Sequence, residues 1–169
     1  MWEIIGQALG IIATIITLLS FQTNTKKRFL LILSFATLTS ALSYLCLGAF
    51  AGFAVNAVAL GRNICLGVQK SATLPSYLCA VLFAVLMCIA GAFSWQGPIS
   101  LLVILPMALS TVMMSFGKPD ILRKTALVAS PAILLYNIFV FSIGGIINEI
   151  LAVSSAVIGI VRFKKAKSE

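Results

Sequence analysis

FAGFAVNAVALGRNICLGV at residues 50–68 and SIGGIINEILAVSSAVIGI at residues 142–160 carry the same stripe of small and amide residues, 92 positions apart. The two stripes are Gly52, Asn56, Asn63 and Gly67, and Gly144, Asn148, Ser155 and Gly159. Spacings of 4, 7 and 4 residues put each stripe on one narrow face of an α-helix, because seven residues complete almost two turns. The sequence therefore predicts two helices that present the same face.

The composition of the chain indicates an integral membrane protein. Hydrophobic residues make up 61% of its 169 residues, and charged residues only 9%. A soluble domain of this length could not bury so much apolar surface, so we expect membrane lipids to surround it. The net charge of +8 does not indicate a nucleic-acid partner, because the basic residues form short clusters between apolar runs.

Seven apolar segments are long enough, or nearly so, to cross a bilayer as helices. They lie at residues 4–21, 29–47, 50–69, 74–93, 98–116, 124–141 and 145–162. Basic residues follow the first, third, fifth and seventh segments, whereas the other connections carry no Lys or Arg. The positive-inside rule then predicts an N-terminus outside and a C-terminus in the cytoplasm. The first segment lacks a basic n-region and a small-residue cleavage site, so we expect a retained helix and not a signal peptide.

An internal repeat organises these segments. The offset of 92 residues maps the first three onto the last three, and it also matches Tyr44 with Tyr136. An offset of four spans is even, so both triplets run in the same direction. We therefore predict an all-α membrane protein whose seven transmembrane helices form two parallel-repeat three-helix bundles joined by a linker helix. The first bundle occupies residues 1–70, the linker helix 71–95, and the second bundle with its basic cytoplasmic tail 96–169.

Asn56 and Asn148 are the leading candidates for contact with a solute. A buried amide in hydrocarbon must satisfy several hydrogen-bonding sites, and two amides at matching depth could line a polar cavity between the triplets. The alternative is that each amide bonds a neighbouring helix and only holds the bundle together. The further substrate-binding candidates are Asn63, Ser155, Tyr136 and Asn137. Interfacial anchoring is the other interpretation for the tyrosines.

Small residues and prolines suggest packing and bending. We expect the stripe glycines to let helix backbones approach closely; they are Gly52, Gly67, Gly144 and Gly159. Pro106 and Pro131 interrupt the fifth and sixth segments. Proline frees backbone carbonyls and permits bending, so both are candidate hinges for alternating access, with tolerated kinks as the alternative.

Arg62 and Glu149 are the charged residues well inside the predicted spans. If the two stripes face each other across a twofold axis, both side chains fall on the same side of the molecule. Arg62 then lies roughly 7–8 Å nearer the cytoplasm. The pair is a candidate for a structural ion pair, or for a gate that responds to protons or solute. The alternative is that each side chain extends to its nearer membrane interface.

No catalytic or metal-binding motif accompanies these residues. The sequence contains no His, and its four Cys lie in apolar segments without paired metal-ligand spacing. It also lacks a Walker loop, a GxSxG motif, an HExxH motif and a CxxC motif. We therefore expect no enzymatic activity, no metal site and no cofactor.

Two families share parts of this pattern. The layout of three, one and three helices, with an Asn in the third helix of each triplet, resembles the SWEET and PQ-loop sugar-transporter superfamily. That resemblance implies pocket roles for Asn56 and Asn148, although the chain has no Pro-Gln dipeptide. Over most of its length the chain is more similar to the YgjV-type bacterial inner-membrane proteins, which implies the bacterial cytoplasmic membrane. The residues that carry this similarity are Leu47-Gly48, Arg62, Ser142-Ile143-Gly144-Gly145, Glu149 and Arg162-Phe163.

The favoured function is translocation of a small polar metabolite, sugar-like or amino-acid-like, by alternating access through a cavity between the bundles. The competing interpretation is a non-transporting membrane scaffold or assembly partner, whose polar stripes only pack helices. A cavity that touches both Asn56 and Asn148 would favour transport, and direct contact between the stripes would favour the scaffold. The sequence is compatible with a homo-oligomer, and it does not identify the solute or a coupled ion.

Overall fold

The structure, a computed structural model, describes residues 1–20, 26–68, 76–114 and 119–165. These residues form seven α-helices, one short 3₁₀ helix and no strand. The elements are α1 (Trp2–Ser20), α2 (Lys26–Cys46), α3 (Phe50–Val68), α4 (Ser76–Phe93), η1 (Pro98–Ser100), α5 (Leu101–Met114), α6 (Pro119–Phe139) and α7 (Ile143–Lys165). The prediction of an all-helical chain with seven helices is confirmed for this part of the sequence.

The observed helices differ from the predicted segments by a few residues at their ends. The largest difference is at α6, which begins at Pro119, five residues before the predicted start at 124. Residues 119–123 include Asp120 and Arg123. Their charges exclude this stretch from an apolar segment but do not prevent it from forming the first turn of a helix. Proline suits the first helical position, because its missing N–H would have no partner within the helix there. Hydropathy therefore locates the apolar part of this helix and not the start of its backbone.

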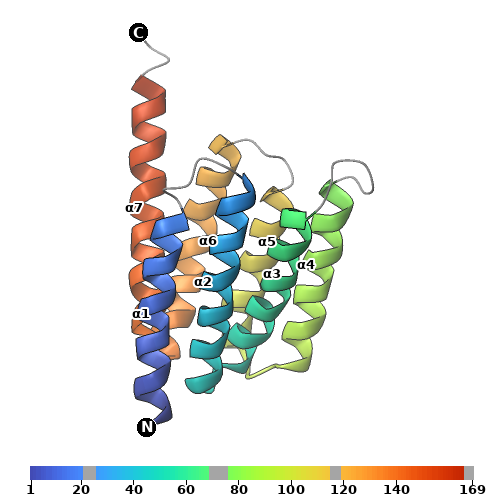
Figure 1. Cartoon of the computed structure of the whole chain (residues 1–169), viewed down its shortest axis with the longest axis vertical. Coiled ribbons are helices and arrows are strands. Elements are labelled where there is room, and N and C mark those ends of the chain that lie inside the picture. Colours follow the sequence, from blue (N-terminus) through green and yellow to red (C-terminus); the bar gives the residue numbers. More distant parts are fainter. Residues whose placement is uncertain (21–25, 69–75, 115–118, 166–169) are drawn as a thin grey trace.

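The helices run alternately in opposite directions and close into a ring (Figure 1). Each helix packs against its neighbours in the chain, and α1 also packs against α7. Because α3 packs against α5 as well, α4 lies at the edge of the ring, as Figure 1 shows. These contacts run through the whole ring and do not by themselves divide it, so the arrangement as two bundles stays a prediction.

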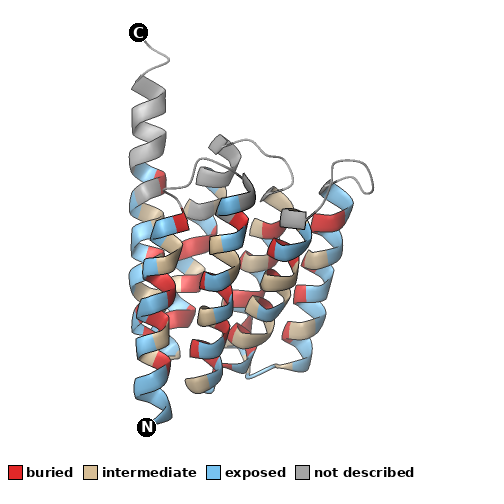
Figure 2. Ribbon diagram, in the orientation of Figure 1, coloured by how far each residue is buried: buried red, intermediate tan, exposed pale blue. Residues whose placement is uncertain are grey.

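The bundle has an apolar surface and a partly polar interior. Figure 2 shows exposed residues along the outer faces of the helices and buried residues toward the middle of the ring. Large apolar side chains that are more than half exposed include Ile15, Phe35, Leu82 and Leu105. Polar side chains buried in the interior include Arg62, Asn63, Thr111, Asn137 and Glu149. This distribution is the reverse of that in a soluble protein and is typical of helices that face lipid.

Helix length and hydropathy single out α1. Among the described residues it is the helix that is long and apolar enough to cross a membrane by itself. Six further apolar stretches of 10–17 residues lie in the other helices. Multiple membrane crossings therefore stay a prediction.

The turns after α2 and α6 share one backbone hydrogen-bond pattern. The turn after α2 places Gly48 at φ 70°, and the turn after α6 places Phe141 at φ 53°. In both turns this residue donates its N–H to the carbonyl three residues earlier. The next residue donates to the carbonyl five residues before it, and all four distances lie between 2.9 and 3.2 Å. This pattern is the Schellman motif, in which a left-handed residue ends a helix and satisfies its last carbonyls.

The two turns lie 93 residues apart, whereas the predicted repeat offset is 92, and the repeat itself stays a prediction. Gly48 corresponds to Phe141, and α2 and α6 begin and end 93 residues apart. Asn56 then corresponds to Glu149, and Asn148 lies one position earlier. The sequence does not choose between offsets of 92 and 93, because Asn148 and Glu149 are both polar. One residue along a helix is a rotation of about 100°, so the two offsets relate different side chains.

The stripe glycines within the described residues lie at close contacts between helices. A side chain at Gly144 would collide with the backbone of Gly10, where α7 meets α1. A side chain at Gly52 would approach the ring of Tyr44 and the hydroxyl of Tyr136 to 2.9 Å. Both positions therefore require a residue without a side chain.

The structure does not test the predicted roles of the two prolines and of three small residues. Pro106 and Pro131 lie inside α5 and α6, which continue through them, and their role as hinges stays a prediction. The surroundings of Gly67, Ser155 and Gly159 lie outside what the structure describes.

Candidate functional site

A polar cavity of about 190 Å³ lies inside the ring of helices; we call it the inner cavity. Its wall is formed by α1, α2, α3, α5, α6 and α7. Asn56, Asn148, Arg62 and Glu149 all contribute to this wall. Hydroxyl groups come from Thr14 and Thr17 on α1 and from Thr37, Ser40 and Ser43 on α2. The structure thus brings both predicted amides and both predicted charges to one cavity.

Arg62 is held in the wall by neutral side chains. Its Nε and Nη2 donate to Asn63 Oδ1 at 3.2 and 3.0 Å, and its Nη1 donates to Thr111 Oγ1 at 2.6 Å. Asn63 Nδ2 in turn donates to Thr37 Oγ1 at 3.1 Å. These bonds connect α3 to α5 and α2. Asn63, which the sequence assigns to solute contact, is fully buried and instead fixes the guanidinium of Arg62.

Glu149 is also held by neutral side chains. Its Oε1 accepts a hydrogen bond from Asn148 Nδ2 at 3.2 Å, and the Ser130 hydroxyl of α6 bonds the same carboxylate. On α3, Asn56 Nδ2 donates to the Gly52 carbonyl of its own helix at 2.8 Å. The Oδ1 of Asn56 therefore remains available as an acceptor in the cavity wall.

Arg62 and Glu149 do not form an ion pair within the described parts of the chain. The hydrogen bonds of both side chains go to neutral groups. Arg62 is 7% exposed and Glu149 is 9% exposed, so neither extends to the surface of the bundle. The ion-pair and interface interpretations therefore do not describe this structure. A role as a gate stays a prediction.

A layer of three side chains, Tyr44, Tyr136 and Asn137, lies at one end of the inner cavity; we call it the tyrosine layer. The Tyr44 hydroxyl donates to Asn137 Oδ1 at 2.6 Å, and the Tyr136 hydroxyl accepts the N–H of Gly52 at 2.8 Å. The two rings have centroids 6.0 Å apart. Among the described residues, Asn137 Nδ2 is a buried side-chain nitrogen without a hydrogen-bond partner. Tyr136 and Asn137, predicted to bind solute, thus belong to this layer.

A second cavity of about 460 Å³, the outer cavity, includes Tyr136 of the tyrosine layer in its wall. Gln7 of α1 and Gln96, which precedes η1, also line it. Gln96 Nε2 donates to the Gly48 carbonyl at 2.7 Å, and its Oε1 accepts an N–H from the start of α3 at 3.3 Å. Gln7 donates to the Phe141 carbonyl and accepts the Ile143 N–H at 2.9 Å. Gln96 therefore holds the turn between α2 and α3, and Gln7 holds the turn between α6 and α7.

The sequence pattern missed several of these residues. Gln7 carried a readable signal, because it is a polar amide in an otherwise apolar segment. Thr111 and Ser130 carried none, since hydroxyl residues in apolar helices commonly bond a carbonyl of their own helix. Thr111 does this as well, and donates to the Met107 carbonyl at 2.8 Å. Its contact with Arg62 depends on helix packing, which the sequence does not display.

Comparison with known proteins places most of the chain in one family. The family model Imp-YgjV, described as a bacterial inner membrane protein, matches residues 4–167. No curated protein and no solved structure matches the chain. The predicted similarity to the YgjV-type proteins is confirmed, whereas the similarity to the SWEET and PQ-loop architecture stays a prediction.

Proposed function

We propose that this chain, which belongs to the Imp-YgjV family of bacterial inner membrane proteins, carries a small polar metabolite across that membrane by alternating access. The solute occupies the inner cavity, where Asn56 and Asn148 contact it. The seven helices cross the membrane as two parallel three-helix bundles, residues 1–70 and 96–169, joined by the linker helix. The N-terminus lies outside and the C-terminus in the cytoplasm.

The polar cavity inside an apolar bundle is the observation that carries this proposal. A polar group in a lipid-embedded interior costs free energy unless it is bonded, so a bundle held together only by packing would close over its amides. Asn56 and Asn148 instead border a common volume of about 190 Å³. That volume is below the roughly 300–1,000 Å³ of pockets for drug-sized ligands, which favours a small solute.

The tyrosine layer supports alternating access, because Tyr44 lines the inner cavity and Tyr136 lines the outer cavity. Alternating access needs a barrier on each side of the solute that opens separately. We assign the outer barrier to Tyr44, Tyr136 and Asn137. Its opening breaks the Tyr44–Asn137 bond and the bond from Gly52 to Tyr136, and water in the outer cavity can replace both.

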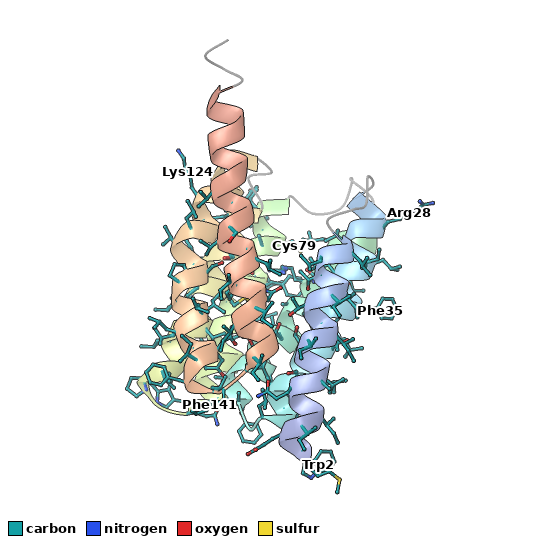
Figure 3. The ribbon with its side chains drawn as sticks, turned by 90° about the vertical axis from the view of Figure 1, so that its left-hand side faces the viewer. Trp2, Arg28, Phe35, Cys79, Lys124 and Phe141 are labelled. Atoms are coloured by element: carbon teal, nitrogen blue, oxygen red, sulfur yellow. The ribbon has the colours of Figure 1, made fainter. Side chains whose placement is uncertain are left out.

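The distribution of labelled residues in Figure 3 supports the orientation. Arg28 and Lys124 lie toward one end of the bundle, and Trp2 and Phe141 lie at the other. Basic residues mark the cytoplasmic side and aromatic residues favour membrane interfaces. The outer cavity, which Phe141 helps to line, then faces away from the cytoplasm.

Uptake by the purified protein in liposomes tests the proposal. The radiolabelled solutes are glucose and a mixture of protein amino acids, and the proteins are wild type, Asn56→Ala, Asn148→Ala and Ser154→Ala. Ser154 is the matched control, because it is exposed on α7 and bonds the carbonyl of Ile150 on its own helix. We expect uptake by wild type and by the control, and a reduction of about two- to tenfold in each Asn variant, from one lost hydrogen bond to the solute.

Two other uptake results would contradict parts of this proposal. Equal uptake by all four proteins would remove the two amides from the mechanism. Uptake no faster than that of protein-free liposomes for every solute would refute transport of these classes and favour the membrane scaffold.

A further inference from the structure

Two ionisable side chains of opposite sign, Arg62 and Glu149, border the inner cavity without contacting each other. Arg62 and Glu149 are each more than nine-tenths buried, and each is bonded only to neutral groups in the described structure. Hydrogen bonds from neutral partners orient a buried charge but do not cancel it. A ligand that brings the opposite charge to each would therefore gain more than a neutral ligand of the same size.

Both charged groups keep capacity to bind a ligand. A guanidinium has five N–H donors in a fixed plane. The bonds from Arg62 to Asn63 and Thr111 use Nε, Nη1 and Nη2 once each, so one N–H on each terminal nitrogen remains. A carboxylate accepts about four hydrogen bonds, and that of Glu149 receives two, from Asn148 and Ser130.

The two charges lie at different depths of one cavity. Arg62 follows the first residue of α3 by 12 positions, and Glu149 follows the first residue of α7 by 6. The two helices run in the same direction (Figure 1) and start from equivalent turns. At a rise of 1.5 Å per residue, the Cα of Arg62 lies about 9 Å farther from those turns. A long arginine side chain shortens this gap, because helical side chains lean toward the N-terminus.

From this arrangement, and resting on the transport function above, we propose that the solute is an amino-acid-like zwitterion. Its carboxylate binds the guanidinium of Arg62, and its ammonium group binds the carboxylate of Glu149. The amides of Asn56 and Asn148 contact the part between the charges. A competing solute that carries one charge leaves either Arg62 or Glu149 without an opposite charge. The protein therefore selects the zwitterion over such a solute.

The first test compares solutes of matched size on wild-type protein in liposomes. Alanine is the zwitterion, lactate its monoanionic analogue, alaninol its monocationic analogue and propylene glycol its neutral analogue. Radiolabelled γ-aminobutyrate adds a zwitterion with a wider separation of charges. We expect alanine or γ-aminobutyrate to enter about tenfold or more faster than any single-charge or neutral analogue, after subtraction of uptake by protein-free liposomes.

The outcomes separate this inference from the transport function. Uptake of lactate, alaninol, propylene glycol or glucose at a rate equal to or above that of both zwitterions would overturn the inference and leave transport intact. Uptake of none of the solutes would overturn both.

Variants test the two residues without relying on total activity. We expect Glu149→Gln to lower uptake of the preferred zwitterion about ten- to hundredfold and to reduce or reverse its preference over lactate. We expect Arg62→Gln to shift the preference toward alaninol in the same way. A purely structural role would lower uptake of all solutes in parallel and leave the ratios unchanged, which would refute the assignment.

Thermal unfolding of the wild-type protein tests the inference even if the variants do not fold. The preferred zwitterion should raise the unfolding temperature of the detergent-solubilised protein, because a ligand stabilises the state that binds it. Lactate and alaninol at the same concentration should raise it less. Equal shifts with all three would contradict the inference.

Discussion

Removal of one hydroxyl group, in Tyr44→Phe, should open the tyrosine layer. The Tyr44 hydroxyl donates to Asn137 Oδ1 at 2.6 Å, and Asn137 is completely buried with its Nδ2 already unpartnered. The substitution keeps the ring and leaves Oδ1 of Asn137 without a partner as well. An unsatisfied buried polar group costs about 1–3 kcal/mol. Hydration of Asn137 in an open layer avoids that cost, so the open population should rise about 5- to 150-fold.

Thiol labelling from outside the cell measures this change. In a background with its four native cysteines replaced, Ser40→Cys places a thiol in the wall of the inner cavity. A membrane-impermeant maleimide added outside should label it about 5- to 150-fold faster when Tyr44→Phe is present. Tyr77→Phe is the matched control, since Tyr77 is exposed on α4, and it should not change the rate. An unchanged rate with Tyr44→Phe would refute the assignment of the outer barrier.

Three further predictions concern the packing of the bundle. In thermal unfolding in detergent, Gly144→Ala should lower the free energy of unfolding by more than about 2 kcal/mol, because the new side chain meets backbone. Gly61→Ala is the control: its Cβ has an ordinary 3.5 Å contact, so the substitution should be neutral or slightly stabilising. Phe141→Gly should raise the stability by about 1 kcal/mol in the same assay, because φ 53° strains an L-residue; a lower unfolding temperature would contradict this. The thiols of Cys65 and Cys79 lie 3.8 Å apart on α3 and α4, so a mild oxidant should join them, and two free thiols fewer per chain should be titrated; an unchanged thiol count would argue against this contact.

The sequence predicts the helices well because each is a local, apolar pattern. Both Asn56 and Asn148 line the inner cavity, and their contact with a solute stays a prediction. The register of the predicted repeat is ambiguous by one residue in the sequence, because Asn148 and Glu149 are both polar. The two turns favour an offset of 93, through the left-handed conformations of Gly48 and Phe141, and a phenylalanine gives no sign of that conformation.

The sequence does not show which side chains meet where three or more helices come together. Asn63, which the sequence assigns to solute contact, is itself fully buried and bonds Arg62 and Thr37. Tyr136 was expected beside the solute or at the interface, but its hydroxyl accepts the N–H of Gly52 from α3. Both outcomes depend on which helix is the third neighbour. Periodicity describes one helix at a time and does not contain that information.

The hydrogen bonds of Gln96 and Gln7 to distant turns determine when each glutamine meets its partner during synthesis. Gln96 follows its partner Gly48 by 48 residues, so the turn that it holds already exists when Gln96 leaves the ribosome. Gln7 precedes its partner Phe141 by 134 residues, which at about 5–20 residues per second is a delay of about 7 to 27 s. During that time the first helix holds an amide without its final partners, at a cost of about 1–3 kcal/mol if it already lies in lipid. The amide of the N-terminal helix thus reaches its final hydrogen-bond partners only after the last turn has been synthesised.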